Sequence, residues 1–363
     1  MKKKILISTG GSGGHVIPAM VFYDHLKNDF EVFLSTDKRG AKFLNFKKYK
    51  IKIINTPKLI NNFFLLPYSL FLIILLIAKS LFFLKKKNID ILISTGGYMS
   101  LPLCVAAKIL NIKIYLFEPN MVLGRANKFF LKFSEKIFCY SNKIKKFTKK
   151  YSNKIILTGP LLRKEFYSIK SYKSTQIGEQ INLLIIGGSQ GAKLFDYEIK
   201  KTIITLSKKY KLKVIHQTSF LNYKNLKKFY TKNSIDNQLF DFDQNILKYI
   251  KKSNLCITRG GASTLSELTF LNIPYLAIPY PFAKDDHQLQ NALFYKNKNC
   301  CWVLTQDKLD QNILTSNLIK IIRNKDEYLL KKKNMKNFSY QNTWNNINQK
   351  IISVINENRI SKN

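Results

Sequence analysis

Ser8-Thr-Gly-Gly-Ser-Gly-Gly-His-Val-Ile-Pro18 is the stretch that decides the fold, and it follows the apolar run Ile5-Leu6-Ile7 directly. A buried strand that breaks into glycines before a helix start outlines a phosphate site. Glycines let backbone N–H groups close on an anion, and the helix N-terminus adds partial positive charge. Pro18 suits a first helical turn, so a helix is predicted from about Pro18. A tight strand-to-helix turn without a ligand is the alternative.

His15 is the unusual member of this stretch. An imidazole at the mouth of a phosphate loop can act as a general base or as a neutral donor to an anion, whereas a lone histidine can also be structural. A dinucleotide fingerprint fits less well, because reading Gly11-Ser12-Gly13 as its start puts Val16 in the place of the third glycine.

Composition limits the class of protein. The 363 residues are enough for two domains, and an apolar content of 45% excludes general disorder. The 61 Lys and Arg residues against 22 acidic ones give a net charge of +39, which indicates anionic partners: membrane headgroups, nucleic acid or phosphorylated substrates. The five cysteines form no Cys-x-x-Cys pair, which favours reduced cytosolic thiols. The apolar run after Lys2-Lys3-Lys4 is too short for a signal peptide.

Strand-like and helix-like segments alternate, which predicts βαβ units and parallel sheets. The expected strands of the first half are 5–8, 31–35, 51–55, 89–94, 113–117, 136–139 and 154–157, with helices from about 18, near 41–47 and over 100–110. The pattern stops in the polar stretch 163–180, and strands return at 182–186, 212–216, 238–241, 254–258, 275–278 and 301–304. This organisation predicts a first domain over 1–162 and a second over 163–338. A C-terminal helix within 339–363 is expected to pack back on the first domain.

The second half repeats the opening pattern with Gly187-Gly188-Ser189-Gln190-Gly191-Ala192. Two copies of strand, Gly-Gly-Ser and helix predict an α/β fold of two Rossmann-like domains that face each other across a cleft. Four glycine pairs follow expected strands: Gly10-Gly11, Gly96-Gly97, Gly187-Gly188 and Gly260-Gly261. Because ligands in open parallel sheets bind beyond the carboxyl ends of strands, these pairs are expected to line that cleft.

An apolar stretch over 63–84 is followed by Lys85-Lys86-Lys87 and is long enough to span a membrane. It joins strands of one expected sheet and contains Lys79, which argues against spanning. An interfacial helix, with apolar residues in the headgroup boundary and lysines on anionic lipid, fits residues 63–87 better. A plain core helix is the other alternative.

The richest chemical signal is Cys256-Ile-Thr-Arg-Gly-Gly-Ala-Ser-Thr-Leu-Ser-Glu267, again a strand, a glycine turn and a helix start. Arg259, Thr264 and the free amides of the first turn could hold a phosphate, and Glu267 could accept both hydroxyls of a sugar diol. Together they suit a nucleoside diphosphate. A capping Glu267 with a surface Arg259 is the alternative. Downstream, His287, Gln288 and Asn291 could bind sugar hydroxyls or simply cap a helix.

Eight motifs then recur in order along almost the whole chain: 10–15, 36–40, 96–102, 118–128, 159–163, 187–192, 259–267 and 286–292. Together they resemble those of the MurG family, the bacterial N-acetylglucosaminyltransferases that convert lipid I to lipid II in peptidoglycan synthesis. The resemblance implies a GT-B fold and a peripheral enzyme on the cytoplasmic face of the inner membrane. It implies transfer of GlcNAc, with inversion, from UDP-GlcNAc to the muramoyl 4-hydroxyl of lipid I, with no cofactor and no protein-bound divalent metal.

The resemblance also implies roles for individual residues. Glu267 is expected at the ribose hydroxyls, and the backbone near Phe242 at uracil. The donor set is Ser12, Gly13, Gly14, Asn120, Arg163, Ser189, Gln190, Phe242, Arg259, Ala262, Ser263, Thr264, Glu267 and Gln288. The acceptor set is Gly10, Gly11, Gly96, Gly97 and Tyr98, and the loops 12–15 and 96–98 are expected to receive the acceptor's diphosphate and muramoyl portion. His15 is the first candidate for the general base and Glu118 the second.

Some positions depart from the family pattern. The family usually has His-Glu-Gln-Asn where this chain has Phe117-Glu118-Pro119-Asn120, so any role of the first and third positions does not carry over. Ser12 replaces the usual Thr and keeps the hydroxyl. Asp241-Phe-Asp243 matches the Asp-x-Asp pattern of metal-dependent transferases, but it falls where the family places only backbone contacts.

Two rival functions stay open on the sequence. A UDP-sugar epimerase shares the two-domain fold and needs no lipid acceptor, but it does not explain the basic apolar stretch 63–87. A basic nucleic-acid-binding protein would need an aromatic-basic surface or a recognised module, whereas the chain has phosphate loops.

Overall fold

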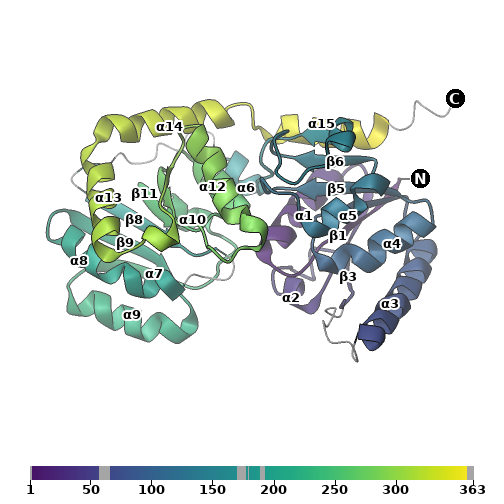
Figure 1. Cartoon of the computed structure of the whole chain (residues 1–363), viewed down its shortest axis with the longest axis horizontal. Helices are drawn as coiled ribbons and strands as arrows, with labels where there is room; N and C mark the ends of the chain where they lie inside the picture. The colour runs from purple at the N-terminus through teal and green to yellow at the C-terminus, as the bar shows by residue number, and fades with distance from the viewer. Residues whose placement is uncertain (1, 57–65, 170–176, 179, 189–192, 358–363) are drawn as a thin grey trace. The chain divides into compact units, whose positions relative to one another are not determined.

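The computed structural model describes residues 2–56, 66–169, 177–178, 180–188 and 193–357. The chain divides into two compact units (Figure 1). One unit comprises Met1–Lys164 together with the segment from Asn342 on, and the other comprises Glu165–Gln341. The division falls after Lys164 rather than after residue 162, so Arg163, which was expected in the second domain, belongs to the first unit.

The first unit contains a seven-stranded parallel sheet in the order β3-β2-β1-β4-β5-β6-β7 within the described residues. Its strands are β1 Lys4–Ser8, β2 Glu31–Thr36, β3 Ile51–Ile53, β4 Ile91–Ser94, β5 Lys113–Glu118, β6 Lys136–Cys139 and β7 Ile155–Leu157. Its α-helices are α1 Gly13–Leu26, α2 Lys38–Ala41, α3 Leu66–Lys87, α4 Leu101–Ile109, α5 Arg125–Phe130 and α15 Trp344–Glu357.

Two predicted helices of this unit begin elsewhere. The helix expected from Pro18 begins at Gly13, because the glycines that follow the capping residue Ser12 already adopt helical backbone. The helix expected near 41–47 is the short α2, Lys38–Ala41. It starts early because the Asp37 carboxylate accepts the Gly40 N–H and caps it.

The first sheet is buried on both faces, as expected for a doubly wound fold. Ile5 and Ile7 of β1 point into a core that also contains residues of α1 and α15, such as Phe22 and Ile351. Leu6, between them, faces the opposite core with Leu84 of α3 and Leu103 of α4. Alternate residues of β1 therefore anchor helices on opposite sides of the sheet.

Helix α15 completes the first core, although it lies at the other end of the chain. Its Ile347 and Ile351 are buried in the same cluster as Phe22. Trp344 stacks on His25 of α1, with ring centroids 3.6 Å apart, and the His25 Nδ1–H donates to the Asn348 amide oxygen at 3.1 Å.

The second unit contains a six-stranded parallel sheet in the order β10-β9-β8-β11-β12-β13 within the described residues. Its strands are β8 Gln180–Ile186, β9 Lys211–Gln217, β10 Asp236–Phe240, β11 Leu255–Thr258, β12 Tyr275–Ala277 and β13 Trp302–Val303. Its helices, with α6 Lys164–Tyr167 at the boundary, are α7 Lys193–Glu198, α8 Lys200–Ser207, α9 Phe220–Lys232, α10 Leu247–Ile250, α11 Ala262–Phe270, α12 His287–Asn297, α13 Gln311–Arg323 and α14 Lys325–Ser339. Every predicted strand occurs in the two sheets, with ends that differ by at most a few residues, and the predicted α/β class is confirmed.

All five cysteines are buried and free, which confirms the expectation of unpaired thiols. Burial raises the pKa of Cys104 to about 12, so this thiol stays un-ionised near neutral pH. The cysteines therefore contribute to packing rather than to redox chemistry.

Protonation of His25 should destabilise the first unit. Burial lowers the pKa of His25 from 6.5 to about 4, so the unfolded chain binds a proton that the folded chain rejects between those values. The contribution of neutral His25 to the free energy of unfolding is therefore present above pH 6.5 and is lost as the pH drops towards 4. Between pH 7.5 and pH 5 the loss should be about 2 kcal/mol. Urea unfolding followed by Trp344 fluorescence in a Trp302→Phe background measures the free energy of unfolding at each pH. The His25→Phe substitution should remove most of the difference between the two pH values. An equal pH dependence in His25→Phe would contradict the assignment.

Candidate functional site

The site of the first unit forms where the strand order reverses, between β1 and β4. The turn after β1 contains Gly11 and the turn after β4 contains Gly96 and Gly97, with φ angles of +82°, +85° and +83°. Residues with a Cβ rarely adopt this left-handed region, so the glycines permit both turns. A Cβ on Gly97 would lie 3.8 Å from the Gly10 carbonyl oxygen, which shows how closely the two turns approach.

His15 lies in the first turn of α1, against the turn that follows β4. Its Nδ1 is 2.8 Å from the carbonyl oxygen of Thr95. Because a carbonyl can only accept, Nδ1 carries a proton, so that in the neutral ring the lone pair is on Nε2. A Cβ on Gly97 would lie 3.7 Å from His15 Nε2, so the ring packs against bare glycine backbone. The arrangement presents a half-buried imidazole with its basic nitrogen beside Gly97.

Asp37, which is not among the residues predicted for the site, holds the turn after β1 in place. Its Oδ1 accepts the N–H groups of Gly11 and Gly40, both at 2.8 Å, and Arg39 donates to its Oδ2 at 2.9 Å. Burial opposes ionisation, but these three donors hold the pKa of Asp37 below its ordinary value. The sequence did contain a signal for this role: Asp37 directly follows β2, and β2 is the strand next to β1.

Glu118 organises the loop that follows β5. Its Oε1 accepts the backbone and side-chain N–H groups of Asn120, and its Oε2 accepts from Gly124 and Asn127. The residue is buried, with a 3% exposed fraction. The structure therefore brings Glu118 and Asn120 together, and the carboxylate is committed to local hydrogen bonds. Asn127 was missed, and it also approaches the turn after β4: a Cβ on Gly96 would lie 3.4 Å from its Nδ2.

The other predicted residues of the first unit surround these turns or lie apart from them. Ser12 is the capping residue of α1 and makes no side-chain capping bond there; Gly13 and Gly14 open that helix. Gly10 packs against Met99, and Tyr98 begins a short 3₁₀ turn after Gly97. Arg163 is buried in the first unit.

The second unit repeats this geometry between β8 and β11, where its strand order reverses. Gly187 and Gly188 follow β8, and Gly188 has a φ of +80°. Ser189 and Gln190, the predicted diphosphate contacts, lie outside the described residues.

The turn after β11 is held by helix α12. A Cβ on Gly260 would lie 2.2 Å from the backbone oxygen of Gln288, so only glycine fits there. The Gln288 Oε1 accepts the N–H groups of Gly260 and Tyr280, at 3.1 and 3.0 Å, and Asn291 donates to the Gly260 carbonyl oxygen. Gln288, predicted as a sugar contact, thus also fixes the backbone of the glycine turn.

Ala262, Ser263 and Thr264 form the first turn of α11. Their N–H groups lack acceptors within the helix, and no side chain caps it. A strand end, two glycines and an uncapped helix N-terminus are the geometry that binds phosphate. Glu267 lies one turn further along the same helix and is 5% exposed.

Arg259 is held rigidly beside this turn. Its Nη1 donates to the Ile278 carbonyl oxygen at 3.1 Å and to Gln306 Oε1 at 2.8 Å. The guanidinium carbon lies 4.9 Å from the Phe195 ring centroid and 5.5 Å from that of Tyr280. Burial lowers the pKa of Arg259, but a guanidinium remains charged in proteins. Its Nε and Nη2 carry further donors in the plane of the fork.

The Asp-x-Asp segment does not present two open carboxylates. The Asp243 carboxylate accepts from Lys248, Asn245 and Tyr249, and although burial opposes ionisation, these bonds hold the pKa of Asp243 below its ordinary value. Asp241 Oδ1 accepts the N–H of Phe242, which is half-buried. Among the described residues, no group of three His, Cys, Asp or Glu could hold a metal ion.

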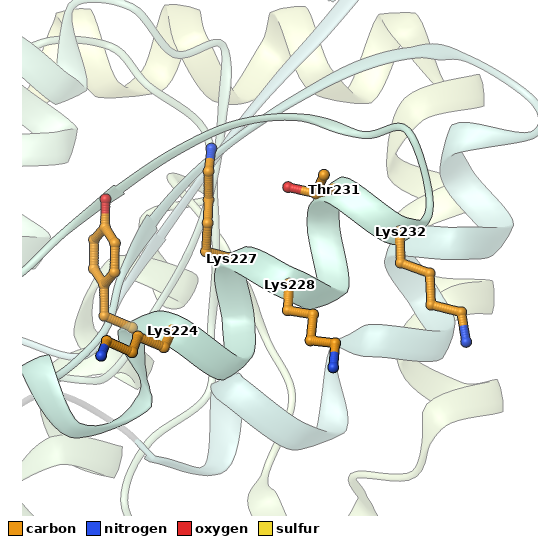
Figure 2. Close-up of a pocket in the computed structure, with 6 residues that line it drawn as sticks. Lys224, Lys227, Lys228, Thr231 and Lys232 are labelled. Atoms are coloured by element: carbon orange, nitrogen blue, oxygen red, sulfur yellow. The ribbon is translucent and has the colours of Figure 1, made fainter.

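A shallow hollow on α9 has a lining of Tyr223, Lys224, Lys227, Lys228, Thr231 and Lys232, all from this one helix. Figure 2 shows that the lysine side chains extend in different directions and do not converge on one point. The hollow is therefore a cationic surface rather than a compact anion site, and the glycine turns remain the candidate functional site.

Known proteins share both halves of this arrangement. The glycosyltransferase family 28 N-terminal domain matches residues 5–139, and the glycosyltransferase family 28 C-terminal domain matches residues 182–348. The chain is 57% identical over 358 residues to the UDP-N-acetylglucosamine–N-acetylmuramyl-(pentapeptide) pyrophosphoryl-undecaprenol N-acetylglucosamine transferase of Pelagibacter ubique (strain HTCC1062), covering 99% of this chain and 100% of the relative. The chain belongs to the MurG family.

Solved structures share the two-domain fold of this chain. The crystal structure of MurG from Acinetobacter baumannii matches with a TM-score of 0.75 and 21% identity, over 98% of this chain and 99% of that one. A UDP-GlcNAc 2-epimerase from Neisseria meningitidis, bound to UDP-GlcNAc, matches with a TM-score of 0.65 and 14% identity, over 98% of this chain and 100% of that one. At these identities both likenesses concern the fold, which is the predicted GT-B class.

Alanine at Gly260 should destabilise the second unit by about 2 kcal/mol, because its Cβ would overlap the backbone of Gln288. Gly261→Ala is the matched control: its backbone has a φ of −71°, and the nearest atom to a Cβ there is 4.0 Å away. Its cost should stay below about 1 kcal/mol. Urea unfolding followed by Trp302 fluorescence in a Trp344→Phe background compares the two, and equal costs would refute the close approach.

Proposed function

We propose that this chain transfers GlcNAc from UDP-GlcNAc to the muramoyl 4-hydroxyl of lipid I and so forms lipid II. The observation that carries the proposal is the 57% identity, over the whole chain, to a transferase whose name describes this activity. The glycine turns at both strand-order reversals support it, since each suits a diphosphate.

The reaction is a direct displacement. The 4-hydroxyl oxygen attacks the anomeric carbon of the α-linked GlcNAc, the bond from that carbon to the UDP oxygen breaks, and the hydroxyl proton goes to a base. We assign the base to His15, whose Nδ1–H is fixed on the Thr95 carbonyl and whose Nε2 can accept the proton. The bond from Nδ1–H to the carbonyl also keeps the ring in one orientation while Nε2 takes the proton.

Glu118 is the weaker candidate for this base. Its carboxylate accepts four N–H bonds from its own loop, so its oxygens are occupied by local donors rather than open to a substrate hydroxyl. Its contacts support a positioning role instead, in which it orders the loop that carries Asn120.

The donor residues of the second unit suit UDP. The first-turn amides of α11 and the Arg259 guanidinium supply positive charge as the diphosphate leaves, and Glu267 accepts the ribose hydroxyls. Since these groups can neutralise the leaving group, we propose that no protein-bound divalent metal is required.

Helix α3 supports attachment to a membrane surface. Among the described residues, Pro67–Lys87 is the helix long and apolar enough to cross a bilayer, yet only 22% of its apolar window is buried, which argues against a plain core helix. Its buried stripe of Ser69, Ile73, Ser80 and Leu84 recurs at helical spacing, and Leu84 belongs to the core shared with α4. A helix packed against its own sheet along one face cannot also be surrounded by lipid.

The outer face of α3 remains apolar. It exposes Tyr68, Leu70, Phe71, Ile74, Leu75 and Phe82, and its last turn carries Lys85–Lys87. An apolar face that ends in lysines suits the headgroup region of anionic lipid. We therefore propose a peripheral location on the cytoplasmic face of the inner membrane, where lipid I is available.

The rival functions are less well supported. The epimerase match is at 14% identity and concerns the fold, whereas the transferase match covers the whole chain at 57%. An epimerase would also leave the exposed apolar face of α3 without a purpose. Nucleic acid is not among the proposed partners. The lysine side chains of α9 extend in different directions and do not form a row that could follow a nucleic-acid backbone.

The transferase proposal predicts that purified protein moves label from UDP-GlcNAc to a lipid I analogue, including in excess EDTA. His15→Ala should lower kcat at least about 100-fold, because the reaction loses its base. Glu267→Ala should raise the donor KM roughly 100-fold, because two hydrogen bonds to a charged group are lost. No transfer by the wild type would refute the activity, and an active His15→Ala would refute only the base.

The membrane proposal predicts that the protein sediments with vesicles that contain phosphatidylglycerol and less with pure phosphatidylcholine vesicles. Phe71→Asp with Ile74→Asp should weaken this binding at least about 10-fold, since both side chains are more than half exposed on α3. Phe220→Asp with Leu221→Asp is the matched control, because it adds the same charge at an exposed apolar pair on α9. Equal losses in both double variants would count against α3 as the contact.

A further inference from the structure

We propose that Gln217 and Thr218, named here the β9 pair, are positioning residues for the diphosphate of the donor. The inference rests on the proposed function, in which the turn after β8 receives UDP-GlcNAc. Two neighbouring side chains at the end of β9 hold the chain on both sides of that turn, and neither is expected to touch the ligand.

Gln217 holds the side of the turn that leaves the strand. Its Oε1 accepts the Gly187 N–H at 3.0 Å and its Nε2 donates to the Gly188 carbonyl oxygen at 2.9 Å. The side chain is 5% exposed, so water does not replace these bonds. One amide thus satisfies a backbone donor and a backbone acceptor of consecutive glycines.

The hold on Gly188 matters because this glycine has a φ of +80° and a Cβ there would meet nothing within 4 Å. Among the described residues, therefore, no atom lies where it would restrict a side chain at this position, and the printed hydrogen bonds of Gln217 are what hold its backbone. Fixing a glycine removes more backbone freedom than fixing any other residue. Without Gln217, that entropy would be lost when the diphosphate binds, and the affinity would fall accordingly.

Thr218 holds the side of the turn that enters α7. Its hydroxyl donates to Asp196 Oδ2 at 3.0 Å, and Asn222 of α9 donates to the same oxygen at 2.7 Å. Asp196 lies in the first turn of α7 and is 5% exposed. Gly188 and the first turn of α7 are therefore each held by one of two adjacent residues at the end of β9.

The surroundings make this anchor rigid. His216, the preceding residue of β9, is fully buried and bonds to the Tyr230 hydroxyl through Nδ1 at 2.9 Å. Its Nε2 lies 3.4 Å from Asp196 Oδ1. Burial lowers the pKa of His216 to about 3, so the ring is neutral at working pH and serves as packing for the Asp196 carboxylate.

The test is calorimetric binding of UDP to the full-length protein and its variants. Gln217→Leu and Thr218→Val should each weaken UDP binding at least about 10-fold, while circular dichroism and the KM for a lipid I analogue stay unchanged. Thr202→Val is the matched control: it removes a buried threonine hydroxyl of the same unit that bonds to Thr315, away from the glycine turns. It should lower stability without lowering affinity for UDP.

Gln217→Glu provides a rescue that a merely structural role would not show. A carboxylate keeps the acceptor for Gly187 but repels the Gly188 oxygen, whereas the protonated acid can donate to it again. Its UDP affinity, relative to the wild type at the same pH, should therefore recover as the pH falls from 8.5 to 5.5. Wild-type affinity in Gln217→Leu or in Thr218→Val, or a ratio independent of pH in Gln217→Glu, would overturn the inference. Failure of the wild type to bind UDP would overturn the proposed function instead.

Discussion

The structure depends on how backbone groups of glycine turns are satisfied at the carboxyl ends of buried parallel strands. A turn that approaches a phosphate must keep its N–H groups bare of side chains, and a buried N–H or C=O without a partner is costly. In each unit a polar side chain from a neighbouring element meets this need. Asp37 binds Gly11, Gln217 binds Gly187 and Gly188, and Gln288 binds Gly260.

The side chains that hold these glycine turns, Asp37, Gln217 and Gln288, differ in charge. Asp37 is ionised and its charge is offset by Arg39 at 2.9 Å. Gln217 and Gln288 are neutral amides, so they fix the backbone of the second unit without reducing the positive potential of α11 and Arg259. A site that must stabilise a leaving diphosphate gains from neutral supports at these two positions, because a carboxylate in place of either amide would add negative charge beside the departing group.

Sequence patterns predicted the two sheets, but not the side chains Asp37 and Gln217 that hold the glycine turns, for a physical reason. Buried strands are continuous apolar runs, and glycine pairs mark their ends, so the strands and turns are visible locally. Asp37 and Gln217 act on backbone atoms that are 26 and 30 residues away in the chain. Their partners depend on which strands become neighbours, and no local period records that. The prediction that α1 begins near Pro18 was wrong for a local reason. Proline is typical of a first helical turn, but the glycines before it already adopt helical backbone, so the helix begins at Gly13.

In the first unit a short run of packed elements connects helix α3 to His15, the candidate base. Helix α3 packs on α4 through the core that contains Leu84 and Leu103. Helix α4 begins directly after the 3₁₀ turn Tyr98–Ser100, which itself follows Gly97, and Gly97 lies against the His15 ring. Since protein cores are close-packed, an element held on a bilayer would hold this turn at a fixed height above the headgroups. The position of His15 relative to a lipid-linked acceptor would then be set by packing within one unit.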